Sequence, residues 1–274
     1  MIRNVLSIAG SDPSGGAGIQ ADLKAFAARG VYGMAVLTAL TAQNTCGVSG
    51  VHLVPPDFVA DQIKAVFADI RVDAIKIGMI ANAEIAKAVA EVLEPHRNIP
   101  IVLDPVMIAK GGASLLASEA IDVLTRLLLP TATLCTPNLP EAAALLQAPV
   151  ATDRQTMADQ AEQLRKLGPQ AVLIKGGHLG GADSPDVLAT ADGIVWFEGN
   201  RQATGNTHGT GCTLSSALAA ELAKGATLPQ AVRHAKQYLA GAIAAADTLS
   251  VGSGHGPVQH FHDLWNDKSE GHLQ

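Results

Sequence analysis

Small residues and one cysteine stand together in residues 206–213, whose sequence is NTHGTGCT, directly before a predicted helix over residues 214–224. Small residues let the backbone approach a ligand closely, and the N–H groups at a helix N-terminus form a site for an anion. Cys212 falls in the first helical turn, where we expect the pKa of its thiol to be lowered. The segment therefore predicts an anion site beside a reactive side chain. The competing interpretation is a plain turn in which Cys212 is a small buried residue.

Three further predicted strands end at polar residues that could bind a nucleotide and its metal ion. Asp104 ends one apolar run, Asn138 and Glu141 follow the next, and Lys175 ends a third and is followed by two glycines. Carboxylates and waters are what Mg²⁺ prefers. Each residue alone has a simpler explanation: a turn cap, a helix capping box, and a solvated lysine. Together with the anion site, they form a set suited to phosphoryl transfer.

The glycine-rich residues 10–18, GSDPSGGAG, match neither of two familiar phosphate loops. They lack the Lys-Ser/Thr pair of a Walker loop, and Ala21 stands where the dinucleotide fingerprint needs its third glycine. Ligand contact and a plain strand-to-helix turn both stay open for this segment.

Short β-branched runs alternate with amphipathic stretches along the whole chain, which indicates parallel strands joined by helical crossovers. Ligands in such a sheet bind outside the carboxyl ends of the strands. We therefore predict one α/β domain over residues 1–274, with a frayed polar end at 266–274. The predicted strands are 5–9, 34–40, 74–79, 101–105, 133–136 and 171–175, with a hairpin over 186–197; the predicted helices are 19–29, 57–70, 83–93, 118–128, 140–147, 152–167, 211–224 and 228–246.

Composition excludes several classes of protein. Hydrophobic residues make up 48% of the chain, aromatic residues only 3%, and the net charge is −6 without a basic cluster, so we expect no nucleic-acid partner. No uncharged apolar run approaches the ~20 residues of a membrane helix, and no signal peptide is evident, so we expect no membrane partner. Three scattered cysteines make no disulfide framework, which favours a cytoplasmic location. His255, His260, His262 and Asp263 do not follow a zinc pattern.

The combined motifs resemble the ribokinase-like superfamily, and within it the hydroxymethylpyrimidine/phosphomethylpyrimidine kinases of thiamine biosynthesis. Most superfamily members have an aspartate, acting as base, at the place of Cys212. A cysteine there, together with residues 9–22 (AGSDPSGGAGIQAD), is similar to the pyrimidine kinases. The other matching segments are 41–45, 76–79, 104–107, 136–138 and 175–178. The resemblance covers about the whole chain and implies a central, mostly parallel sheet flanked by helices on both faces.

The resemblance also implies a reaction: ATP with Mg²⁺ phosphorylates 4-amino-5-hydroxymethyl-2-methylpyrimidine and then its monophosphate. It implies a homodimer, toward which the family tends. By this resemblance, the catalytic residues are Cys212, Gly211, Gly209 and Lys175. The pyrimidine is expected to contact Gln43, Gly10, Asp22, Met79 and Val106. The nucleotide is expected to contact Asn138, Lys175, Thr210 and Lys236, and the metal is expected near Asp104 and Glu141. For Lys236 a solvated position on the last helix is the alternative.

The side chain of Gln43 is also chemically suited to bind an aminopyrimidine. The edge of that ring offers a donor beside an acceptor, and a glutamine amide offers the complementary pair. Without the resemblance, a surface glutamine in a loop would be the simpler interpretation. Three other functions stay open. They are pyridoxal or pyridoxine kinase activity of the same family, a cysteine hydrolase with Cys212 as nucleophile and His208 as base, and a nucleotide-binding regulator without catalysis.

Overall fold

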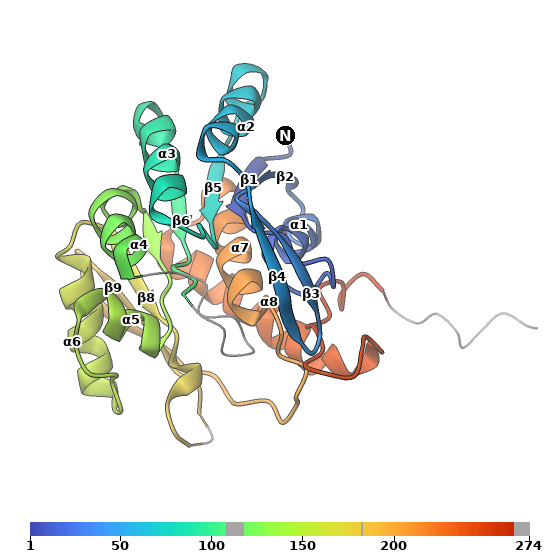
Figure 1. Ribbon diagram of the computed structural model, residues 1–274. Coiled ribbons are helices and arrows are strands. Elements are labelled where there is room, and N and C mark those ends of the chain that lie inside the picture. The colour runs from blue at the N-terminus through green and yellow to red at the C-terminus, as the bar shows by residue number, and fades with distance from the viewer. Residues whose placement is uncertain (108–117, 182, 266–274) are drawn as a thin grey trace, which may run out of the picture.

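A computed structural model describes residues 1–107, 118–181 and 183–265. Its centre is an eight-stranded sheet in the order β10-β9-β8-β7-β6-β5-β1-β2 (Figure 1). All neighbouring strands from β8 to β2 are parallel, while β9 and β10 pair antiparallel at one edge. The strands are β1 (Asn4–Ala9), β2 (Tyr32–Leu37), β5 (Ala74–Ile77), β6 (Ile101–Leu103), β7 (Leu134–Cys135), β8 (Ala171–Ile174), β9 (Asp186–Thr190) and β10 (Gly193–Phe197).

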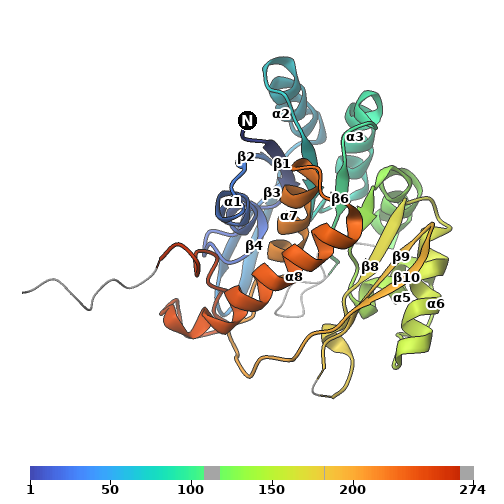
Figure 2. The ribbon, with the colours of Figure 1, turned by 180° about the vertical axis from the view of Figure 1, so that it is seen from behind.

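Helices cover both faces of this sheet (Figures 1 and 2). One apolar cluster joins the sheet to α2–α6, and a second joins it to α1, α7 and α8. Successive side chains of a strand point to opposite faces of the sheet, so they belong to different clusters. Val5 belongs to the second cluster and Leu6 to the first. The helices are α1 (Gly18–Ala28), α2 (Pro56–Asp69), α3 (Ala83–Leu93), α4 (Ser118–Val123), α5 (Leu139–Leu146), α6 (Arg154–Arg165), α7 (Thr210–Ala223) and α8 (Leu228–Ala244).

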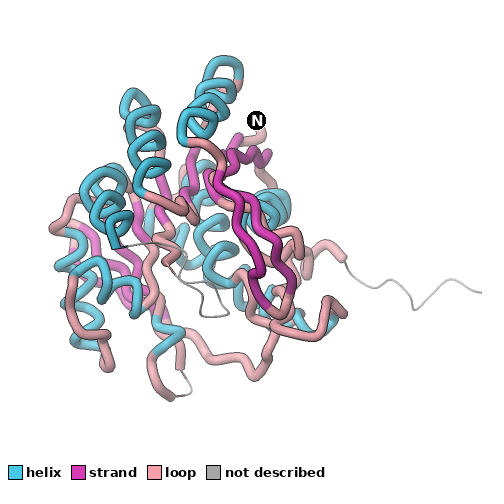
Figure 3. Tube along the Cα trace, viewed as in Figure 1, coloured by secondary structure: helices cyan, strands magenta, loops and turns pink. Residues whose placement is uncertain are grey.

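A separate two-stranded hairpin, β3 (Ala39–Asn44) with β4 (Gly47–Leu53), projects from the sheet beside α7 (Figure 3). The predicted single strand over 34–40 is therefore wrong at its end. The pairing of β2 with β1 ends at Leu37, and the next residue, buried Thr38, donates its N–H to Ala9 O and its hydroxyl to Met79 O. The next residues then pair with each other instead of with the sheet.

The remaining predicted elements are confirmed, with ends that shift by a few residues. The helix expected over 118–128 is α4 followed by a π-helical turn, Leu124–Leu128. The hairpin predicted over 186–197 is β9–β10. The tail at 266–274 lies outside the described residues. Within the described part of the chain, no helix combines the length and the apolar character that crossing a membrane requires.

Candidate active site

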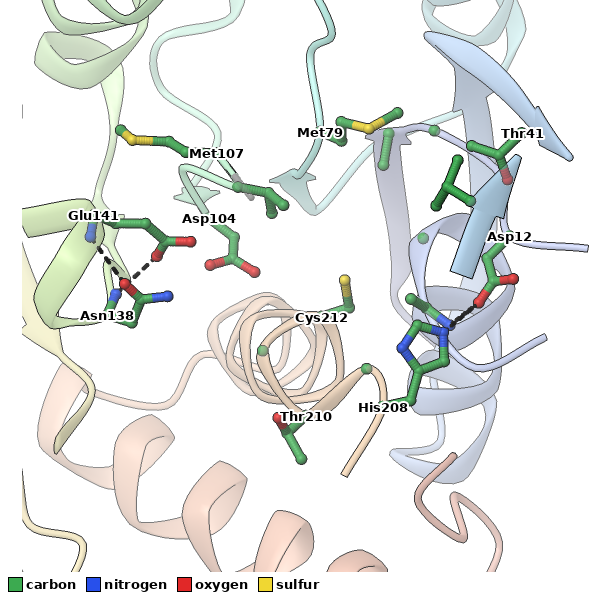
Figure 4. Close-up of a pocket in the computed structure, with 18 of the residues that line it drawn as sticks. Asp12, Thr41, Met79, Asp104, Met107, Asn138, Glu141, His208, Thr210 and Cys212 are labelled. Carbon is green, nitrogen blue, oxygen red and sulfur yellow. Dashed lines mark hydrogen bonds and ion pairs between the residues drawn. The ribbon is translucent and has the colours of Figure 1, made fainter. Parts of the chain in front are cut away.

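A cavity of about 560 Å³ opens at the carboxyl ends of the parallel strands, where α7 begins (Figure 4). Cys212 lies between an Asp104–Glu141 side and an Asp12–His208 side. The structure brings most of the predicted site residues to this one cavity. Those in its lining are Gly10, Gln43, Met79, Asp104, Val106, Asn138, Glu141, Lys175, Gly209, Thr210, Gly211 and Cys212.

The first turn of α7 forms the floor of the cavity. Gly209 is its N-cap with φ 78°, and a Cβ there would lie 1.7 Å from Gly16 O, so only glycine fits. The N–H groups of Gly211 and Cys212 belong to the first helical turn, whose N–H groups have no partner within the helix. They are thus available to an anion, which the positive end of the helix dipole also favours.

Lys175 lies beside this helix end, between two buried carboxylates. Its Nζ is 2.8 Å from Asp104 Oδ1 and 3.8 Å from Glu141 Oε2. Burial would lower the pKa of Lys175, but Asp104 and Glu141 outweigh it and raise that pKa. A Cβ at Gly211 would lie 3.5 Å from Lys175 Nζ and 3.6 Å from Asp104 Oδ2. The glycine therefore leaves open a space between the cation, the carboxylate and the helix end.

Asn138 and Glu141 form the capping box of α5 that the sequence predicted. The Asn138 side chain accepts the Glu141 N–H at 2.8 Å, and Glu141 Oε2 accepts the Asn138 N–H at 2.7 Å. Burial, opposed by Lys175 and reinforced by Asp104, raises the pKa of Glu141 to about 7. The two residues thus have a structural role and also line the cavity.

The carboxylates of Asp104 and Glu141 fit a magnesium ion better than a zinc ion. Across residues 1–107, 118–181 and 183–265, no group of three or more His, Cys, Asp or Glu side chains could hold a metal. Mg²⁺ is usually held by one or two carboxylates, with waters and substrate phosphates completing its shell. The donor set of this cavity matches that chemistry.

The expectation of a lowered thiol pKa at Cys212 is wrong. Burial raises the pKa of the thiol to about 11, although the charge of Lys76 opposes that rise. The carboxylates of Asp22 and Asp104 add to the rise. Desolvation and these charges therefore outweigh the position in the first helical turn.

Asp22 and Lys236 do not belong to the cavity lining. Asp22 is fully buried and accepts from Lys76 Nζ at 2.8 and 2.9 Å, and it takes further hydrogen bonds from the hydroxyls of Ser7 and Ser216. Burial would lower the pKa of Lys76, but Asp22 outweighs it and raises that pKa. Lys76 reaches the cavity, and Asp22 lies behind it.

Lys236 binds Asp186 Oδ2 at 2.6 Å and Ser184 O at 3.0 Å. Asp186 Oδ1 in turn accepts the N–H of Gly176, the residue after Lys175. Lys236 therefore supports the loop that follows Lys175 from outside the cavity.

The sequence did not single out the pair formed by Asp12 and His208, whose Oδ2 and Nε2 are 2.7 Å apart in the cavity wall. The sequence suggested His208 only as the base of a possible cysteine hydrolase. No local pattern links it to Asp12, which lies 196 positions away. Of the C-terminal histidines, His260 is buried: its Nε2 lies 3.0 Å from Thr213 Oγ1, and burial lowers its pKa to about 4.

Comparison with known proteins agrees with this architecture. The sequence model of the phosphomethylpyrimidine kinase family matches residues 12–259. The chain is 56% identical over 262 residues to the hydroxymethylpyrimidine/phosphomethylpyrimidine kinase of Salmonella typhimurium, covering 96% of this chain and 98% of that protein. The phosphomethylpyrimidine kinase structure from Clostridium difficile 630 superposes with a TM-score of 0.78 at 43% identity, covering 88% and 99% of the two chains.

A related vitamin kinase has a similar structure. The pyridoxal kinase of Staphylococcus aureus in complex with AMP-PCP and pyridoxal superposes with a TM-score of 0.88 at 35% identity, covering 97% of this chain and 96% of that one. The ribokinase-like fold is thus confirmed. The family model matches most of the chain, and the Salmonella typhimurium enzyme is 56% identical to it over 262 residues. The protein therefore belongs to the phosphomethylpyrimidine kinase family.

Proposed function

We propose that the protein transfers a phosphoryl group from ATP to the hydroxymethyl group of 4-amino-5-hydroxymethyl-2-methylpyrimidine, and then to the resulting monophosphate. One observation carries the proposal. A single cavity of about 560 Å³ has a helix-end anion site, Lys175 and two carboxylates on one side, and the Gln43 amide on the other. Phosphoryl transfer needs a cation and oriented N–H groups at the transferred group, and an acceptor held in line with it.

Lys175 and the N–H groups of Gly211 and Cys212 bind the transferred phosphoryl group and stabilise the charge that spreads over its oxygens. Asp104 and Glu141 would hold Mg²⁺, which when bound would supply positive charge that neutralises the phosphates. Thr136 and Ser215 donate to Asp104 at 3.2 Å each, so this carboxylate keeps its orientation before any ligand arrives.

The acceptor side combines apolar residues such as Met79 with the polar side chains of Gln43, Asp12 and His208. A Cβ at Gly10 would lie 2.2 Å from Met79 Cε, so the glycine backbone and the methionine form one flat wall. Gln43 comes from β3, at a register shift in the hairpin, and reaches into the cavity. A flat aminopyrimidine ring between this wall and the Gln43 amide presents its hydroxymethyl group toward Cys212.

A coupled assay of ADP release tests the proposal, with the aminopyrimidine alcohol, its monophosphate and pyridoxal as acceptors. We expect turnover of the first two at kcat/KM values well above that for pyridoxal. Faster turnover of pyridoxal would assign the protein to vitamin B6. Tight ATP binding without any turnover would favour a regulator, and covalent trapping of Cys212 without ATP would favour a hydrolase. The homodimer, the cytoplasmic location and the single-domain organisation stay predictions.

A further inference from the structure

The main chain on both sides of Lys175 is fixed by hydrogen bonds. Its own N–H donates to Pro137 O at 2.9 Å, where an isolated parallel bridge pairs it with Asn138. The next N–H, that of Gly176, donates to Asp186 Oδ1 at 2.9 Å in a buried contact. The first bond restrains the φ angle of Lys175 and the second its ψ angle, which are −83° and 119°. Together they determine the direction in which the Lys175 side chain leaves the main chain.

Asp186 reaches this peptide group because Gly176 has no side chain. A Cβ at Gly176 would lie 1.8 Å from Pro185 O and 2.9 Å from Pro185 C. Only glycine permits so close an approach of the two segments. Asp186 follows Pro185 as the first residue of β9 and is 6% exposed. The close approach therefore places a buried carboxylate against the residue after Lys175.

Lys236, on α8, holds the other oxygen of this carboxylate. Its Nζ lies 2.6 Å from Asp186 Oδ2 and also donates to Ser184 O at 3.0 Å. A Cβ at Gly199 would lie 3.1 Å from this Nζ, so a glycine again leaves the room. A carboxylate accepts at both oxygens, so one can face the Lys236 cation while the other faces the Gly176 N–H. The two contacts fix the plane of the Asp186 carboxylate.

We propose that Asp186 is a positioning residue for phosphoryl transfer, because it fixes the peptide group between Lys175 and Gly176 and thereby aims the Lys175 ammonium at the transferred group. The inference rests on the proposed function, in which Lys175 stabilises the charge on that group. Asp104 and Glu141 hold the ammonium only at the far end of a flexible four-carbon stem. The start of that stem is set by the main chain, which Asp186 holds.

Loss of the Asp186 acceptor would leave the buried Gly176 N–H without a partner. A buried N–H without an acceptor is costly, so the peptide group would turn toward another acceptor. Lys175 shares this peptide group and would move with it. A misplacement of about 1 Å at a catalytic group can cost about 10²-fold in rate.

The test compares two double variants that both remove the ion pair. The first combines Asp186→Asn with Lys236→Gln: the asparagine oxygen accepts the Gly176 N–H, and its NH₂ group donates to the glutamine oxygen. The second combines Asp186→Leu with Lys236→Met, which keeps a branched side chain but offers no acceptor. Neither variant leaves a buried charge unpaired, so a difference between them reports the hydrogen bond to Gly176.

The readout is the single-turnover rate with the aminopyrimidine alcohol at saturating Mg-ATP. We expect the rate to fall about 10- to 100-fold in the second variant and less than about threefold in the first. The KM values of ATP and of the alcohol should change less than about threefold in both, because the aim of the ammonium acts on the transition state. Asp186→Ala with Lys236→Met, which adds less bulk, gives the same comparison where the leucine prevents folding.

A cycle with Lys175→Met separates positioning from a merely structural role. On that background the two double variants should react at equal rates, because no ammonium is left to aim. A difference that persists there, or equal rates of the two variants with Lys175 present, would overturn the inference. So would a second variant that unfolds at lower urea concentration but keeps the wild-type rate. A wild-type protein that does not phosphorylate the aminopyrimidine overturns the proposed function instead, so the two failures are distinct.

Discussion

The polar side chains of the cavity are held by backbone and buried partners rather than by ligand. The Glu141 carboxylate accepts the Asn138 N–H, the Asp12 carboxylate accepts three N–H groups, and Asp104 is held by Lys175 and two hydroxyls. Fixed dipoles of this kind need no reorganisation when charge moves during the reaction. Substitutions that leave these partners paired should therefore change binding or rate with small effects on folding.

Gln43→Leu should weaken binding of the pyrimidine and leave ATP binding nearly intact. The amino group and ring nitrogen of the substrate would lose their partners in a closed pocket, a loss of about 1–3 kcal/mol, or roughly 5- to 150-fold in KM. Steady-state kinetics with each substrate varied in turn provides the measurement. The matched control is Gln163→Leu on the exposed face of α6, which should change neither value. An equal loss of both affinities would make Gln43 a structural residue.

Cys212→Ala should slow phosphorylation of the alcohol more than that of the monophosphate. The alcohol holds its proton at neutral pH and gains from a base, whereas a phosphate monoester is already largely ionised. With a thiol pKa of about 11, only about one molecule in 10⁴ carries the thiolate at pH 7, so the alcohol rate should also climb with pH between 7 and 10.

Single-turnover rates at saturating Mg-ATP measure both steps. In Cys212→Ala the climb with pH should disappear from the alcohol step. Cys212→Asp, the commoner residue of the superfamily, should recover part of the alcohol rate. Equal slowing of both steps by Cys212→Ala would mean that the cysteine shapes the anion site and is not a base.

At the scale of elements, local patterns were enough to predict most of the fold. Once apolar runs of strand length alternate with amphipathic helices, few sheet topologies are possible. Parallel strands then bring Asp104, Asn138 and Lys175 to one edge of the sheet. The sequence did not predict the β3–β4 hairpin. Its strands carry small and polar residues, are exposed on one side, and lack the apolar alternation of a half-buried strand. Gln43 was therefore placed by resemblance, and its position on a strand was found only in the structure.

Gly211→Ala tests the open space at the start of α7. The added methyl would lie 3.5 Å from Lys175 Nζ and 3.6 Å from Asp104 Oδ2, which is ordinary contact in the folded protein but occupies room for a phosphate. We expect a melting temperature close to wild type and a fall of about 10²-fold or more in kcat/KM for ATP. Gly205→Ala, where a Cβ meets nothing within 4 Å, is the control. A large drop in melting temperature with intact turnover would contradict the prediction.

Lys76→Met tests the buried ion pair that joins β5 to α1. The pair is fully buried, and the variant would leave Asp22 with only the hydroxyls of Ser7 and Ser216 as donors. We expect a loss of about 3–5 kcal/mol in the free energy of unfolding by denaturant. Arg97→Met, which breaks the exposed pair with Glu94, should cost less than about 1 kcal/mol. Equal effects of the two substitutions would show that burial does not govern the Lys76 pair.

At the scale of the whole molecule, a C-terminal segment ties distant parts of the cavity together. The His255 N–H donates to Thr45 O at 2.9 Å at the tip of the β3–β4 hairpin, and Gly256 O accepts from His208 at the start of α7. Contacts between residues 210 and 48 positions apart leave no trace in local periodicity. For this reason the acceptor side of the cavity was harder to predict than the nucleotide side, which strand ends and the start of α7 assemble.

Gly254→Val should loosen the hairpin. A Cβ at this position would lie 2.2 Å from Thr45 O, so the segment must move off the hairpin tip. We expect faster amide exchange over β3 and β4 and a KM for the pyrimidine that rises several-fold, while the KM of ATP stays unchanged. Gly180→Val, in open space, serves as the control. Unchanged exchange in the hairpin would show that this segment does not hold it.

The same long-range ties set an order of events during protein synthesis. A ribosome releases the chain from its N-terminus, so β1 to β8 can pair while later residues are still being added. Asp12 has no His208 until about three-quarters of the chain exists, and Thr45 does not meet Gly254 and His255 until those residues emerge. The nascent polypeptide therefore acquires Asp104, Asn138 and Lys175 at the sheet edge before it acquires the helix-end anion site and the vitamin side. Ribosome-bound chains stalled before residue 254 should protect the sheet from protease while the β3–β4 hairpin is still cut.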